Sequence, residues 1–145
     1  MPSSAPGLVS LSLADAQLIS DGAIEEAEKQ GVKVTISISD SGGRILLVNR
    51  MDGAPWGTVH GSQGKAIAAA GFNLSTGRLA PHGDATDVGQ THQHVRRSEG
   101  QHMIFARGGV AIFRDNVVVA SCGVDGGTGE EDEKCARAGV ARIQA

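Results

Sequence analysis

Aromatic side chains, long apolar runs and a strong charge of one sign are the features that this sequence has least of. Its 145 residues include three Phe, one Trp and no Tyr. A core of bulky rings is therefore excluded and small side chains must fill it, which favours an oligomer. The longest apolar run is far short of the ~20 residues that cross a bilayer, and residues 1–10 lack the profile of a signal peptide. We therefore expect a cytoplasmic protein with no membrane partner.

Charge and cysteine content exclude further classes of function. The 13 basic and 16 acidic residues give a formal net charge of −3, which favours no nucleic-acid partner. Cys122 and Cys135 are too few for a disulfide framework and their spacing fits no zinc motif, so we expect buried thiols. The sequence has neither a P-loop lysine nor the glycine spacing of a dinucleotide site, which predicts no nucleotide cofactor.

Helices and strands follow one another in a readable order within one domain, residues 1–145. Ser12 begins a helix that Gly31 ends. Val and Ile alternate with polar residues over 32–39, which predicts a half-buried strand, and a Gly-containing turn makes residues 32–51 a hairpin. A second helix is expected over 58–70. The face that it should bury comprises Val59, Gln63, Ala66, Ile67 and Ala70.

The C-terminal part of the chain predicts a second hairpin and a last helix. Residues 108–125 form the hairpin around a two-residue Asp-Asn turn, and Thr128 with Glu131 forms a capping box for the helix that follows. This order predicts an α/β protein of the α+β type, with a single-layer antiparallel sheet and helices packed on its faces, in a profilin-like arrangement. The side chains expected in the core include Val34, Ile36, Ile38, Ile112, Val117 and Val119.

Three stretches in the same order carry a family resemblance. They are VTISISDSGGRILLVNRMDGA (34–54), QGKAIAAAGFNLSTGRL (63–79) and GGVAIFRDNVVVASCGVDGGTGEEDEKCARAG (108–139). Together they resemble the GlcG/HbpS-like family over most of the chain. Two residues depart from the family's pattern: Asp125 stands where the family has Ser, and Ala111 where many members have Pro.

The resemblance implies a protein that binds haem, a corrinoid or a similar anionic organic ligand in a pocket that a neighbouring subunit completes. The scarcity of aromatic residues argues against a deep porphyrin pocket. Other members of the family are lyases acting on hydroxylamino-aromatics. The alternative is therefore a small lyase or isomerase in a catabolic pathway, acting on a small aromatic or hydroxy acid.

Several basic residues are candidates for binding an anionic group. Lys65, on a helix of small residues, is either a point charge for a ligand carboxylate or an ordinary surface lysine. Arg50 and Arg78 could each bind a carboxylate through two nitrogens, or be surface residues. His60 precedes Lys65 and is either a pocket wall or a solvated residue.

The segment 81–102 holds four of the five histidines and matches no family pattern. His92 and His94 are two residues apart, so in an extended chain both imidazoles lie on one side. They could bind a divalent metal or act as acid and base near neutral pH, or simply be exposed in a loop. A third metal ligand could be His60, His82, His102, Asp84 or Asp87, and the spacing selects none.

Carboxylates at the last helix have two possible roles. Asp125 lies in a Gly-rich turn before the helix and is either a catalytic base held ionised by backbone N–H groups or a turn-forming residue. Glu131 is either a ligand-binding residue or a capping residue. Together with His92 and His94, Asp125 completes the predicted catalytic set.

Overall fold

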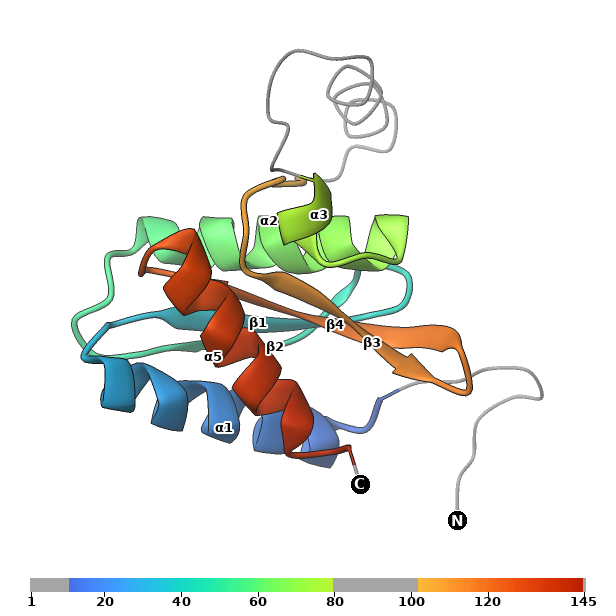
Figure 1. Ribbon diagram of the computed structural model, residues 1–145, viewed down its shortest axis with the longest axis horizontal. Helices are drawn as coiled ribbons and strands as arrows, with labels where there is room; N and C mark the ends of the chain where they lie inside the picture. Colours follow the sequence, from blue (N-terminus) through green and yellow to red (C-terminus); the bar gives the residue numbers. More distant parts are fainter. Residues whose placement is uncertain (1–10, 80–101, 145) are drawn as a thin grey trace.

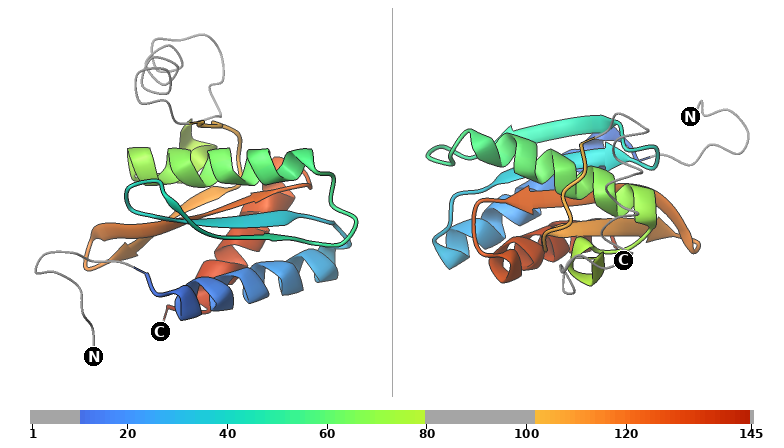
Figure 2. Two further views of the ribbon diagram at one scale, coloured as in Figure 1. Left: turned by 180° about the vertical axis from the view of Figure 1, so that it is seen from behind. Right: turned by 90° about the horizontal axis from the view of Figure 1, so that it is seen from above.

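A four-stranded antiparallel sheet lies at the centre of the computed structural model, which describes residues 11–79 and 102–144 (Figure 1). The strands are β1 (Thr35–Asp40), β2 (Ile45–Arg50), β3 (Gly109–Arg114) and β4 (Val117–Asp125), in the order β2-β1-β4-β3. Helices α1 (Leu13–Gln30) and α5 (Gly129–Ala141) cover one face, while α2 (Gly57–Phe72) and the short α3 (Thr76–Leu79) lie on the other side (Figure 2). The predicted antiparallel sheet with helices on its faces is confirmed.

Local signals in the sequence set both ends of α1 and the start of α5 as predicted. The Ser12 side chain accepts a hydrogen bond from the Asp15 N–H at the start of α1, and Gly31 ends the helix at φ 74°. The capping box of Thr128 and Glu131 at α5 is also present. No helix within the described residues is both long and apolar enough to cross a bilayer.

The face of the sheet under α1 and α5 holds the main apolar core. Alternate residues of β1 and β4 lie on this face, together with small residues of both helices, as the composition required. The fully buried side chains include Ile19, Val34, Ile36, Ile38, Ile112, Val119 and Val124. Val117 is the exception among the predicted core residues, because it directly follows the hairpin turn, and it is 53% exposed.

The opposite face of β1 is buried as well, so the predicted half-buried strand is wrong. Thr35, Ser37 and Ser39 are fully buried. Burial of a hydroxyl costs little when it finds a hydrogen-bond partner. Each of these has one: the oxygen pairs are Thr35–Thr58 at 2.7 Å, Ser37–Ser62 at 2.7 Å and Ser39–Ser121 at 2.6 Å.

The carbonyl groups of α2 and of the turn before it determine the direction of these hydrogen bonds. A hydroxyl has one proton, and the second member of each pair donates it to a carbonyl. Those donations run from Thr58 to Pro55, from Ser62 to Val59 and from Ser121 to Ala66. The Thr35 and Ser37 hydroxyls therefore donate to their partners, whereas the Ser39 hydroxyl has the Asp40 carbonyl, 3.0 Å away, as a second acceptor. Hydrogen bonds as well as apolar contacts hold α2 on the sheet.

The buried residues of α2 include Ala66, Ile67 and Ala70, as predicted, but the buried face extends further than the predicted one. Val59 and Gln63 are only partly buried, whereas Thr58, Ser62, Lys65 and Ala69 are buried. The reason is that this helix binds the sheet through polar and small residues, so apolarity alone does not identify its inner side.

The second hairpin forms as predicted around Asp115 and Asn116. Both residues have positive φ, 52° and 65°, which is the combination that a tight two-residue hairpin turn requires. A bulge between Ile112 and Phe113 shifts the register of β3 against β4.

We expect Gly123→Ala to lower the free energy of unfolding by about 3 kcal/mol, because α2 lies directly on β4 at this glycine. A Cβ there would meet the Ser62 carbonyl oxygen and the Ala66 amide nitrogen, and neither backbone atom can rotate away. The matched control is Gly57→Ala, at the start of α2, where no atom lies within 4 Å of the added carbon. Urea denaturation that shows equal stability for the two variants would contradict the close approach.

Candidate functional site

The charged centre of the molecule is the Lys65 ammonium, which is buried between two carboxylates. Its Nζ lies 2.9 Å from Asp132 Oδ2 and 3.0 Å from Asp125 Oδ1, and it donates a third hydrogen bond to the Val124 carbonyl at 2.9 Å. Lys65 is 3% exposed and the Asp132 side chain 1%, whereas the Asp125 side chain remains 29% exposed. The interpretation of Lys65 as a surface lysine is therefore wrong.

Three elements meet at this cluster. Lys65 comes from the middle of α2, Asp125 from the end of β4, and Asp132 from the first turn of α5. Asp132 Oδ1 also accepts from the Gly127 N–H at 2.8 Å. The chain closes over the ammonium at Gly108, which has φ 133° and leaves no room for a side chain beside Lys65.

Burial and the ammonium act in opposite directions on Asp132. Burial raises the pKa of its carboxyl, and the nearby Lys65, the Gly127 N–H and their hydrogen bonds lower it, with burial the larger effect. Asp125 is the accessible carboxylate of the cluster, and it accepts its hydrogen bond from Lys65 rather than from its own turn. It is thus the group of this cluster that a ligand in solution can reach.

Glu131 and Glu133 have separate roles at the start of α5. Glu131 accepts from the Thr128 N–H at 2.8 Å, which confirms its capping role. Glu133 accepts hydrogen bonds from Arg107 Nε at 3.1 Å and from Arg137 Nε at 3.0 Å. Partial burial would raise the pKa of Glu133, but the hydrogen bonds from the two guanidinium groups outweigh it and hold that pKa below its usual value of 4.5.

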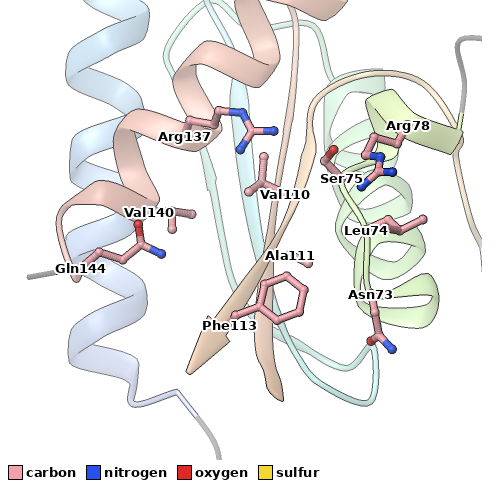
Figure 3. Close-up of a pocket in the computed structure, with 10 residues that line it drawn as sticks. All are labelled: Asn73, Leu74, Ser75, Arg78, Val110, Ala111, Phe113, Arg137, Val140 and Gln144. Atoms are coloured by element: carbon pink, nitrogen blue, oxygen red, sulfur yellow. The ribbon is translucent and has the colours of Figure 1, made fainter. Parts of the chain in front are cut away.

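A groove of about 570 Å³ runs along the outer edge of β3 (Figure 3). Arg137 on α5 and Arg78 on α3 reach into it from opposite walls. Among the predicted ligand-binding residues, Arg78 is the one that lines this groove. The remaining lining residues are Asn73, Leu74, Ser75, Val110, Ala111, Phe113, Val140 and Gln144.

Two other predicted residues lie around the loop that leads into α2, at the other edge of the sheet. Arg50, at the end of β2, is exposed and its Nε donates to the Ala54 carbonyl at 2.9 Å. His60 is also exposed, and its ring meets that of Trp56 edge-on at a centroid distance of 6.0 Å. Trp56 is 71% exposed. We call Arg50, Trp56 and His60 the Trp56 surface.

The predicted pair His92 and His94 lies outside the described residues, as do His82, Asp84 and Asp87. Their roles as metal ligands, acids or bases stay predictions. His102 is described and exposed. Within residues 11–79 and 102–144, no group of three His, Cys, Asp or Glu side chains is arranged to hold a metal ion.

The thiols are buried, as predicted. Burial raises the pKa of Cys122 far above its ordinary value, and burial with nearby carboxylates raises the pKa of Cys135 to about 12. Neither thiol has the lowered pKa of a nucleophile.

Sequence reasoning missed Asp132, Arg137 and Trp56 as site residues. Asp132 and Arg137 were not identified because acidic residues at a helix start and basic residues further along the same helix have ordinary structural explanations. The signal that could have identified Trp56 was its position. It is the chain's one Trp, and it lies just before the helix that the sequence predicts over 58–70.

The fold places the chain among small α+β proteins that have one antiparallel sheet between helical layers. The chain also matches the family described as "Haem degrading protein HbpS-like" over residues 11–141. It therefore belongs to the HbpS-like family, as the resemblance in its sequence predicted.

Curated relatives share about a quarter of its sequence. An uncharacterized 15.0 kDa protein of Citrobacter freundii, from the dhaT-dhaS intergenic region, is 28% identical over 125 residues, which are 86% of each chain. The corrinoid adenosyltransferase PduO of Salmonella typhimurium is 27% identical over 135 residues. These are 93% of this chain but 39% of PduO, so the likeness spans well under half of that enzyme.

Solved structures share the fold closely. Protein ORFY of Klebsiella pneumoniae has a TM-score of 0.83 at 28% identity, covering 100% of this chain and 97% of ORFY. A double mutant of Streptomyces reticuli HbpS has a TM-score of 0.81 at 29% identity, covering 100% and 98%. The PduOC chain in its complex with haem has a TM-score of 0.78 at 25% identity, covering 94% and 96%.

We expect Lys65→Met to lower the free energy of unfolding by about 3–5 kcal/mol, because it leaves two carboxylates without their counter-ion, one of them buried. Adding Asp125→Asn and Asp132→Asn to Lys65→Met should restore part of that loss, since no unpaired charge then remains. Denaturant midpoints at neutral pH measure both effects. If Lys65→Met alone were as stable as the parent, the ammonium would not organise the cluster.

Proposed function

We propose that this chain binds haem, a corrinoid or a similar flat organic anion. The observation that carries the proposal is membership in the HbpS-like family together with the likeness to a PduOC chain that was crystallised with haem. A small-molecule ligand also agrees with the acidic net charge of −3, which gives no field for nucleic acid.

The Trp56 surface has the chemical groups that haem requires. Haem iron takes an imidazole as axial ligand, and His60 is an exposed imidazole. Trp56 offers an exposed ring on which a flat molecule can stack. Arg50 binds Ala54 through Nε and keeps its terminal nitrogens for a carboxylate such as a propionate. The groove along β3 contains no His, Cys or Met among its lining residues, so it suits iron less well.

A second subunit would make this surface into a pocket. The three side chains are exposed and cover one side of a ligand only, whereas binding sites usually bury most of the ligand. The predicted homo-oligomer supplies the missing wall in this proposal. His92 and His94 stay candidates for a second iron ligand or for a divalent metal.

We expect haem to bind the parent with a shifted Soret band, and His60→Ala to abolish the shift while leaving the fold intact. Arg50→Gln should weaken binding about three- to tenfold, as loss of one charge-assisted contact does. His102→Ala, another exposed histidine, is the matched control and should bind like the parent. Absorbance titrations with haemin, and light scattering for the size of the complex, measure these effects.

The histidine variants separate the possible outcomes. If His92→Ala or His94→Ala loses the band and His60→Ala does not, the iron ligand lies in the segment 80–101 and the Trp56 surface is rejected. If the parent itself binds neither haemin nor a corrinoid, the proposed function is wrong.

The Lys65 cluster favours a second candidate, an enzyme that acts on a small aromatic or hydroxy acid without a nucleotide cofactor. Asp125 is a partly exposed carboxylate held in place by a buried ammonium, which is a suitable arrangement for a general base. Carboxyl groups whose pKa is shifted by burial are common at active sites, and here such a group lies beside an accessible carboxylate.

We expect Asp125→Asn to lower turnover about 10²- to 10⁴-fold if Asp125 is the base. The substrate to assay is a hydroxylamino-aromatic acid, with its loss followed by chromatography. Asp52→Asn changes an exposed carboxylate and is the control. Equal rates for the parent and Asp125→Asn, or no turnover by the parent, would exclude this candidate.

A further inference from the structure

The groove along β3 has the unpaired edge of a strand as its floor. β3 is the last strand of the sheet, so it pairs with β4 on one side only. Its neighbours across the groove are α5 on one wall and the segment 73–78 on the other (Figure 3). The edge therefore lies at the bottom of a trough rather than on an open surface.

The hairpin register shows which backbone groups point into this trough. Residues of an antiparallel pair alternate between those bonded to the partner strand and those that point away from it. Gly109 points away, because its N–H donates to Thr76 Oγ1 at 2.7 Å. Two residues further along, Ala111 must point away as well.

The same rule applies from the other end of the strand. Arg114 and Val117 flank the two-residue turn and form a bonded pair, so Phe113 points away from β4. The N–H and C=O groups of Ala111 and Phe113 therefore face the trough, and they have no hydrogen-bond partner among the described residues.

Thr76 blocks only the first position of this edge. Its hydroxyl takes the place that an incoming strand would occupy at Gly109. Beyond Gly109, the N–H and C=O groups of Ala111 and Phe113 remain, two residues apart, which is the spacing that a neighbouring strand requires. Unpaired edges of this kind bind extended peptides by adding a strand.

Charge selects the kind of segment that fits. Arg78 and Arg137 lie on opposite walls (Figure 3). Arg137 uses its Nε for Glu133, and Arg78 has no ion pair with any described residue. Terminal guanidinium nitrogens are thus available for a carboxylate at this end of the groove. Apolar contact comes from Leu74 and Val140.

The two walls of the groove also argue against a second copy of β3 as the partner. Edge-to-edge pairing of two such strands would drive α5 and the segment 73–78 of one copy into those of the other. Ala111 is only 9% exposed, which is consistent with a recessed edge. An extended segment without flanking helices does not meet this obstacle.

We infer that the β3 groove binds an extended peptide segment that carries a carboxylate, by adding it as a fifth strand beside Ala111 and Phe113. Arg78 and Arg137 bind the carboxylate. The site lies at the edge of the sheet opposite to β2 and the Trp56 surface, so it is independent of the haem proposal.

The probe is the peptide acetyl-Thr-Val-Thr-Val-Thr with a free C-terminal carboxylate, added to ¹⁵N-labelled full chain. We expect the amide signals of Ala111 and Phe113 to shift with dose and to exchange more slowly with solvent. The same peptide with a C-terminal amide should bind about three- to tenfold more weakly, and Arg78→Gln with Arg137→Gln should remove that difference.

Ala111→Pro tests the strand itself. Proline is tolerated at an edge position whose N–H points away from the sheet, so the ladder to β4 is kept while the donor is lost. We expect Ala111→Pro to lose peptide binding and Ala111→Ser to keep it. A peptide N-methylated at its central residue should also fail to bind, which tests the inference even if the proline variant does not fold.

Three results of the peptide experiments, and a fourth from light scattering, would overturn the inference. The first is an absence of shifts at millimolar peptide, and the second is undiminished binding by a folded Ala111→Pro variant. The third is that acetate alone produces the same shifts with the same affinity, which would show a carboxylate site without strand addition. A dimer in light scattering that Ala111→Pro dissociates would mean that a second copy occupies the edge instead.

Discussion

The buried Lys65 ammonium is the interaction on which the rest of the structure depends. A buried charge must be paired, so the positions of Asp125 and Asp132 are constrained by it. Because these residues end β4 and begin α5, the cluster fixes how the last helix leaves the sheet. The bend at Gly108 closes over the same ammonium and starts β3. The β3 groove, formed by that strand and α5, therefore depends on a side chain that does not line it.

Much of the fold could be predicted from the sequence because its signals are local. Ser12, Gly31 and the Asp115–Asn116 turn act on the backbone within a few residues of themselves, and the structure has them as predicted. The burial of Thr35 and its neighbours could not be predicted, since alternation with polar residues usually indicates a face in water. What reverses it is a helix that offers hydroxyl groups to those of β1, and that contact is distant in sequence.

The candidate site was predictable only in part, for the same reason. Lys65, Arg50, His60, Arg78 and Asp125 were singled out by residue type, and their grouping came from topology. Lys65 and Asp132 are 67 positions apart, and no local pattern predicts that they meet. The strand order β2-β1-β4-β3 places Arg50 and Arg78 towards opposite edges of the sheet, so they lie on two separate surfaces rather than in one pocket.

These two surfaces differ in a way that bears on what each can bind. In the proposed function, the Trp56 surface would recognise a ligand through side chains alone, including the His60 imidazole. The groove presents backbone groups of Ala111 and Phe113, which recognise another backbone whatever its side chains. The Ala111 N–H is a donor that a proline at this position would not offer. The groove therefore depends on a backbone group, whereas the Trp56 surface depends on its side chains.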